Sequence, residues 1–218
     1  MKKALSICVF VLITHAASAQ LVNLGFRGRF TSAKLSAGFN GTNSRSSSLN
    51  VVDIGIFPEL DYSTIVFQPG LAFIQKGGSS NSDRSSGFGS NFSDNSLTIN
   101  YLELPLNVLY KIPVKPGKIL LGGGPYVAYA TSAHTTVTTF DQNGDMVNNK
   151  QKDAVPLGSG VNDLKHFDYG INLLATFRIK NGIEAGLGAG FGLGNLSNTA
   201  TVKTHNQTLS LSLAYFFQ

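Results

Sequence analysis

Apolar residues alternate with polar or small ones along eight separate stretches of the chain, and this period of two constrains the fold more than any other feature. The stretches are 21–30, 51–61, 64–75, 98–111, 118–131, 167–179, 183–195 and 208–217. Short turns are expected between them near 61–63, 112–117 and 180–182, and long polar loops at 31–50, 76–97, 132–166 and 196–207. Short and long connections therefore alternate. We predict an all-β fold, an up-and-down antiparallel meander of about eight strands closed into a transmembrane barrel.

The phase of the alternation distinguishes a membrane barrel from a soluble one. Along 167–179 one set of alternate residues is apolar, whereas the other carries Asp168, Asn172 and Arg178. A soluble lipocalin-like barrel would keep its apolar residues inside, but here the phase is expected to be reversed, with the apolar face toward lipid. After the N-terminal segment, no stretch approaches the roughly 18 apolar residues that a membrane helix needs. Only 13% of the residues are charged.

The N-terminus has the pattern of an export signal. Lys2 and Lys3 precede an apolar run, and the small residues of 17–19 provide a cleavage site. We predict a signal peptide over 1–19, a mature protein that begins at Gln20, and a single barrel domain over 20–218 in the outer membrane. An uncleaved membrane anchor is the alternative, but the run is too short to span a bilayer. Cys8 is the only cysteine, so the mature chain has no thiol for a disulfide, a metal site or a nucleophile.

Charged residues recur on the face assigned to the barrel interior. They are Arg27, Arg29, Asp53, Glu59, Glu103, Asp168, Arg178 and Glu184. One interpretation is a relay or binding site. The other, which we favour, is a charge-compensated filling, because unpaired buried charge is costly and a narrow barrel holds little beyond its own side chains. A row of glycines along 183–195 is expected to leave room for the arginines and for Tyr126.

The connection at 180–182 sets the register of its two strands. A three-residue Lys180-Asn181-Gly182 loop with Gly182 at positive φ pairs Arg178 with Glu184 inside the barrel. A two-residue turn would mix the two faces, so we reject that register.

The last strand carries an apolar stripe that ends in aromatic residues, as outer-membrane barrels typically do. Leu213, Tyr215 and Phe217 are expected to serve as a C-terminal assembly signal for the barrel-assembly machinery. Gln218 after the final Phe departs slightly from that pattern.

Four segments in order resemble a known family. They are YLELPLNVLY at 101–110, GGGPY at 122–126, FDYG at 167–170 and LSLSL at 209–213. Together they resemble the PorT-like outer-membrane β-barrel family of Bacteroidetes-type bacteria, over essentially the whole mature chain. The resemblance implies an eight-stranded outer-membrane barrel. The founding member is associated with protein export through the type IX system, but no residue here is diagnostic for that role.

Motifs for catalysis or metal binding are weak. His134, His166 and His205 fall in or beside long loops without zinc-site spacing. His166 near Asp168 would suit a hydrolase only if a loop serine joined them. The segment 141–145 resembles the start of a calcium loop, but Lys152 stands where a bidentate glutamate belongs.

Loop 132–166 is instead expected to contain a β-hairpin that turns at Asn143-Gly144. Phe140 and Val147 would form an apolar pair on one face of this hairpin. That pair either offers an interaction site to another protein or folds onto its own loop.

The leading functional hypothesis is a non-enzymatic outer-membrane protein that acts through its loops, as an envelope-assembly partner or a surface-interaction protein, with a link to protein export. The alternatives are a small transport barrel for a solute or apolar ligand, and a lipid-modifying enzyme. We expect no cofactor or metal. The expected partners are outer-membrane lipid, the barrel-assembly machinery and other envelope proteins. The basic residues are scattered, which argues against a nucleic-acid partner.

Overall fold

The computed structural model describes residues 22–39, 42–81, 92–140, 151–161, 163–199 and 201–217, and these residues form one antiparallel sheet. Its strands are β1 (Val22–Phe39), β2 (Thr42–Arg45), β3 (Leu49–Tyr62), β4 (Ile65–Pro69), β5 (Leu71–Asn81), β6 (Phe92–Val114), β7 (Gly117–Phe140), β8 (Gln151–Ala154), β9 (Phe167–Ile179), β10 (Ile183–Gly192) and β11 (Val202–Phe216). The described residues include no helix with the length and apolar character to cross a membrane. The predicted signal peptide lies outside the described residues.

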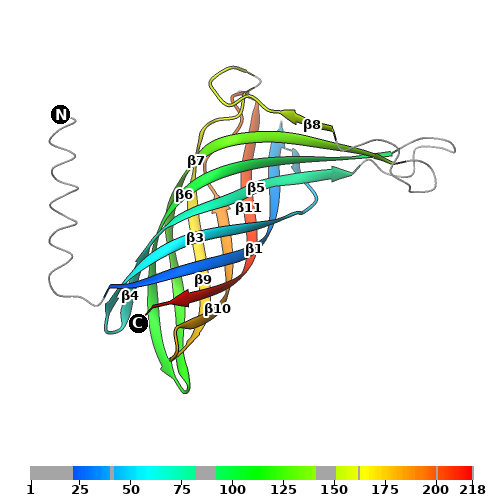
Figure 1. Ribbon diagram of the computed structural model, residues 1–218. Coiled ribbons are helices and arrows are strands. Elements are labelled where there is room, and N and C mark those ends of the chain that lie inside the picture. The colour runs from blue at the N-terminus through cyan, green and yellow to red at the C-terminus, as the bar shows by residue number, and fades with distance from the viewer. Residues whose placement is uncertain are drawn as a thin grey trace, which may run out of the picture.

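The sheet closes on itself, because β1 pairs with β3 on one side and with β11 on the other. The ring runs β1, β3, β4 with β5, β6, β7, β9, β10 and β11 (Figure 1). The short strands β2 and β8 attach outside this ring, to β1 and β7. With β4 and β5 counted as one position, eight strands form the barrel. The predicted fold class is confirmed.

Three tight turns lie at one end of the barrel, between β3 and β4, between β6 and β7, and between β9 and β10. In the last of these, Gly182 has φ 88° and its N–H donates to the Ile179 carbonyl at 3.1 Å. Arg178 lies opposite Glu184. The three-residue turn and the register predicted from it are confirmed.

At the other end the strands run much further than the sequence predicts. The segments 31–39, 76–81, 92–97, 132–140 and 202–207 are strand rather than loop. They are rich in Ser, Thr and Asn on both faces, so no alternation marks them, but their backbone groups pair with neighbouring strands. Figure 1 shows β5, β6 and β7 extending beyond the tube as a curved sheet.

The hairpin predicted within 132–166 is partly visible. β7 and β8 pair antiparallel, with Val137 opposite Gln151. Val137 lies six residues before Asn143 and Gln151 seven residues after Gly144, and the turn itself is outside the described residues.

The predicted strand 64–75 is interrupted at Gly70 and becomes β4 and β5. β3 pairs with β4 and with β5 in the same register, and this register places Pro58 opposite Pro69. Neither proline has an N–H to donate, so the ladder lacks hydrogen bonds at this level. Gly70 instead donates to the Pro105 carbonyl of β6 at 3.0 Å.

Apolar side chains cover the outside of the barrel and polar ones fill much of the inside. In β9 exposed and buried residues alternate along the whole strand. Aromatic residues lie at both ends of the apolar band, as in outer-membrane barrels: Tyr62, Tyr110, Tyr215 and Phe217 near the tight turns, and Tyr129, Phe167 and Tyr169 at the opposite end. This phase is the reverse of that in a soluble lipocalin-like barrel.

Candidate functional site

The charged interior is the best-defined polar site of the described residues. The strands place all eight predicted charged side chains on the inner face. Seven are almost fully buried, and Arg29 is partly buried. Some partners lie on neighbouring strands, as Asp53 does for Arg29, whereas others meet across the lumen, as Glu59 of β3 and Arg178 of β9 do.

Five side chains from five strands form a closed ring of hydrogen bonds around Arg178. Both terminal nitrogens of Arg178 donate to the Glu59 carboxylate at 2.7 Å, and its Nε donates to Glu184 Oε2 at 2.9 Å. Arg27 Nη2 donates to the other oxygen of Glu184 at 2.8 Å and to Gln68 at 3.1 Å. Gln68 completes the ring by donating to Glu59 at 2.6 Å. Bidentate pairing of this kind is the strong form of the arginine–carboxylate interaction.

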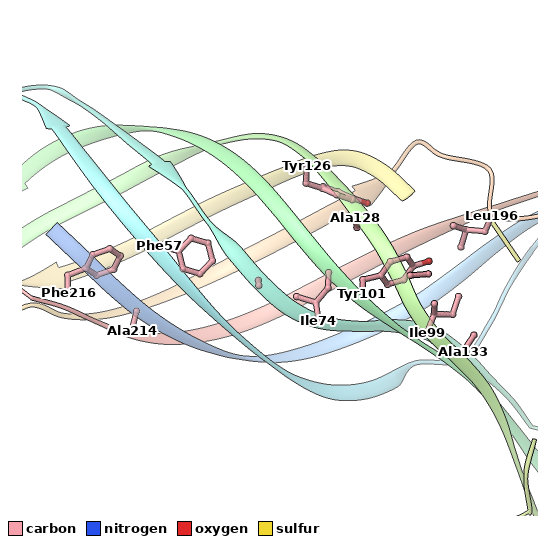
Figure 2. Close-up of a cluster of buried hydrophobic side chains, with 12 residues drawn as sticks. Phe57, Ile74, Ile99, Tyr101, Tyr126, Ala128, Ala133, Leu196, Ala214 and Phe216 are labelled. Atoms are coloured by element: carbon pink, nitrogen blue, oxygen red, sulfur yellow. The ribbon is translucent and has the colours of Figure 1, made fainter. Parts of the chain in front are cut away.

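Two aromatic rings cover the arginines of this ring. The guanidinium carbon of Arg178 lies 3.5 Å from the Phe216 ring centroid, and that of Arg27 lies 4.5 Å from the Phe57 centroid. Figure 2 shows Phe57 and Phe216 together at one end of the buried cluster. The two guanidinium groups and the two aromatic rings therefore occupy the lumen together at this level.

A second cluster is centred on Lys76, on the side of the ring toward the long connections. Lys76 Nζ lies 3.0 Å from Glu103 and 3.2 Å from Asp168. The Tyr126 hydroxyl and the Asn206 amide also donate to Asp168, at 3.3 and 3.0 Å. Lys76 is absent from the predicted charged interior because 76–97 is predicted to be a loop. The alternation along the strand could have identified it, because Lys76 lies two residues after Ile74 and so belongs to the same inward-facing set as Gln68, Ala72 and Ile74.

Tyr126 does not pack where the glycine row of β10 was expected to admit it. The Tyr126 hydroxyl lies over Gly170 of β9, 2.7 Å from where a β-carbon would be. The β10 glycines face Thr176, Thr208 and Ser210 instead. The expectation was wrong because Tyr126 lies directly opposite Gly170 on the neighbouring strand β9, whereas β10 is one strand further round the barrel.

Asp53 and Arg29 form a third, looser group. Their closest atoms are 3.6 Å apart, and Asp53 also accepts from the Thr31 hydroxyl at 2.6 Å and the Gln75 N–H at 2.9 Å. A cavity of only about 20 Å³ lies beside them. That volume is close to the space of one water molecule and far below that of a ligand pocket.

The rim near the tight turns carries further pairs that the sequence analysis did not identify. Asp61 binds Lys111 at 2.6 Å and Lys118 at 3.5 Å, and Lys118 also reaches Glu59 at 3.5 Å. Across these ion pairs of the described residues, six basic groups meet six acidic ones: Arg27, Arg29, Lys76, Lys111, Lys118 and Arg178 against Asp53, Glu59, Asp61, Glu103, Asp168 and Glu184. The charges balance within the barrel.

Apolar side chains from the long connections cover the other end. Leu196 is buried against a cluster that includes Ile99, Tyr101 and Ala133, and Leu157 and Leu164 pack onto the same cluster. Figure 2 shows Leu196 beside Tyr101, Ile99 and Ala133, at the end opposite Phe57. Backbone hydrogen bonds fix this cover, with Lys165 N donating to the Leu196 carbonyl at 3.0 Å.

The histidines do not assemble a catalytic group. His166 stacks on the outward-facing Tyr129, with ring centroids 5.1 Å apart, whereas Asp168 points into the lumen. His205 contacts the Gly194 carbonyl at 3.0 Å. His134 lies on β7 opposite Ala154, where partial burial and, secondarily, Lys152 lower the pKa of its imidazole. In the described part of the chain, no three His, Cys, Asp or Glu side chains group to hold a metal ion.

The remaining predicted residues lie on outer surfaces or beyond the described residues. Leu213, Tyr215 and Phe217 project outward from the end of the chain, and the Phe217 ring contacts both Tyr215 and Phe26. Phe140 ends β7, is half-buried and lies opposite Phe92. Val147, Gln218 and the calcium-like segment 141–145 are outside the described residues.

Comparison with known proteins gives one family match. A family model described as an outer membrane protein beta-barrel domain matches residues 18–208. No curated protein matches the sequence.

Among solved structures, the chain is similar to Ail, the attachment invasion locus protein of Yersinia pestis, at 8% identity and a TM-score of 0.39, over 89% of this chain and 100% of that one. It is also similar to Neisserial surface protein A at 10% identity and 0.34, over 88% and 97%. OprG from Pseudomonas aeruginosa gives 12% identity and 0.30, over 91% and 97%. Similarities this low do not bear on function.

Proposed function

Because the chain belongs to the outer membrane protein beta-barrel domain family, we propose that it is a non-enzymatic outer-membrane barrel whose specific interactions are made by its extracellular strands and loops. In this role it acts as a partner in an envelope assembly or as a surface-interaction protein. The tight turns then face the periplasm and the long connections face outward, as in bacterial outer-membrane barrels.

The observation that carries the proposal is the obstructed lumen. The ring of Arg27, Glu59, Gln68, Arg178 and Glu184 joins five strands across the interior, and two aromatic rings stack on its arginines. The apolar cover around Leu196 lies beyond it. A transport barrel would need a path past both, and the interior cavity next to Asp53 is too small for a solute.

The extracellular surface is the part of the molecule left for specific contacts. The strands β5, β6 and β7 extend past the apolar band, and β8 adds a short, fully exposed strand to β7. Regular strands hold their side chains in fixed positions, which favours recognition over the mobile loops that the sequence alone suggested.

The separation of His166 from Asp168 supports a non-enzymatic role, because it removes the arrangement that a hydrolase would need. The outward-facing Leu213, Tyr215 and Phe217 are proposed to be read by the barrel-assembly machinery. The PorT-like resemblance adds protein export to the processes in which such a partner could act.

Two measurements test the proposal. Planar-bilayer conductance of the purified protein should show no steady open channel, and a porin-like channel would overturn the proposal of a filled barrel. The second measurement compares the proteins that co-purify with wild type and with a variant in which Asn-Gly replaces 138–150. Val137 and Gln151 lie directly opposite each other, so a two-residue turn can join them and keep the β7–β8 pairs, although the β6 pairs of 138–140 are lost. Loss of partners is expected, and an unchanged partner set would overturn the role of this hairpin.

A further inference from the structure

Basic side chains gather on the outer face of β2, β1 and β11, directly beyond the apolar band. Residues of even number in β1 and of odd number in β11 face outward. The outward pair Ser32–Leu209 is the last to contain an apolar residue. The following outward pairs are Lys34–Gln207, Ser36–His205 and Gly38–Lys203.

Arg45 joins this face from β2. It lies opposite Ser36, so it shares the outward side with Lys34. Diagonal neighbours of this kind in antiparallel strands are about 7–8 Å apart, within reach of long side chains. Lys34, Arg45 and Lys203 are all exposed. We call Lys34, Arg45, Lys203 and the adjacent His205 the basic patch.

The strands that carry the basic patch contribute no acidic side chain to it. Residues 22–52 and 185–217 contain no Asp or Glu, so β1, β2 and β11 carry none. The one acid of β10, Glu184, points into the lumen. The nearest acid along β3 is Asp53, which also points inward. By contrast, the opposite side of the extracellular end carries Asp94 and Asp153 beside Lys152. The outer face formed by the described residues of β1, β2 and β11 is therefore positive at the height where the membrane ends.

We propose that the basic patch binds the phosphate groups of glycolipid in the outer leaflet. This inference rests on the outer-membrane location and goes beyond the proposed loop-mediated role. The basic patch lies directly beyond the apolar band, and this position favours a lipid as the bound molecule. A lipid whose acyl chains contact Phe30 and Leu209 holds its headgroup beside Lys34. Lys and Arg attract phosphate, and the attraction is strongest at a membrane surface that concentrates the anion.

The test compares lipid retention in nanodiscs of phosphatidylcholine that contain either bisphosphorylated lipid A or the same lipid without its phosphates. Mass spectrometry after mild detergent release counts the lipid A molecules on each barrel. Wild type should retain the phosphorylated form preferentially. Replacement of Lys34, Arg45 and Lys203 by Gln should lower this retention by about fivefold for each charge removed, and the single variants should fall in between.

A control variant removes the same charge elsewhere, with Lys115, Lys152 and Lys180 replaced by Gln. These three are also exposed but lie outside the basic patch. The proposal would be overturned if this control lost as much lipid A as the patch variant, or if the patch variant retained as much as wild type. It would also be overturned if wild type retained lipid A equally with and without its phosphates. Equal binding of a soluble sulfated dextran to the patch with and without lipid A would also overturn the proposal, because lipid A would then not be occupying the patch.

Discussion

Replacing Arg178 with Gln should be among the most destabilising single changes in the barrel. Arg178 makes contacts of 2.7 to 2.9 Å with two carboxylates, and its side chain is 1% exposed. Without it, Glu59 and Glu184 remain buried with fewer partners. Glu184 keeps Arg27, and Glu59 keeps Gln68 and the more distant Lys118.

Removing one partner of a buried ion pair typically costs about 3–5 kcal/mol, because the remaining charge stays desolvated. We expect Arg178→Gln to lower the free energy of unfolding by an amount in this range. The matched control is Arg29→Gln, whose pair with Asp53 is 3.6 Å long and whose side chain is 15% exposed. Because Asp53 keeps its hydrogen bonds from Thr31 and Gln75, losing this longer pair should cost less than losing the two carboxylate pairs of Arg178.

Urea titration of the protein folded in lipid vesicles measures both variants. The chain contains no tryptophan, so the folded fraction is best followed by the gel mobility of unboiled samples or by circular dichroism. Adding Glu59→Gln to Arg178→Gln should recover part of the loss by neutralising one stranded carboxylate. If Arg178→Gln costs no more than Arg29→Gln, the ring does not stabilise the barrel as argued.

Three further predictions concern the barrel as a whole. Leu211→Arg, on the apolar face, should cost about 2–4 kcal/mol, whereas Leu211→Phe, which keeps an apolar side chain toward lipid, should cost much less; equal unfolding midpoints would mean that the outer face is assigned wrongly. Boiled and unboiled samples should migrate differently on a denaturing gel, since the closed ladder resists detergent, and identical migration would argue against closure. Mass spectrometry of the exported protein should find Gln20 at the N-terminus, and an intact Met1 or a lipid on Cys8 would contradict the predicted signal peptide.

The alternation of inward and outward residues along each strand explains how much of the barrel interior can be predicted from the sequence. Once Asp168 and Arg178 are assigned to one face of β9, every second residue follows, and the same reasoning places Glu59 and Glu103. The alternation also places Phe216 inside, between the outward Tyr215 and Phe217. It does not indicate that the Phe216 ring stacks on Arg178 of another strand.

Contacts between distant strands are the part that no local pattern provides. Arg178 and Glu59 are 119 residues apart in sequence, and Arg27 and Glu184 are 157 apart. The charges are visible in the sequence, but the identity of each partner depends on how far the closed sheet is sheared.

These separations lead to a last prediction, on the order in which the ring forms. Arg178 and Glu184 flank one tight turn, so their pair can form as soon as β9 and β10 meet. Arg27 reaches Glu184 only after β11 has joined β1, because β11 lies between β1 and β10. Closing that separation costs the most chain entropy, which favours a late step.

Arg27→Gln should therefore speed unfolding and leave the folding rate nearly unchanged, as expected for a contact absent from the transition state. Arg178→Gln should slow folding as well, because it also removes the local pair. Gel-shift kinetics of folding into vesicles and of unfolding in urea measure both rates. Slower folding of Arg27→Gln with an unchanged unfolding rate would place barrel closure before the transition state and contradict this order.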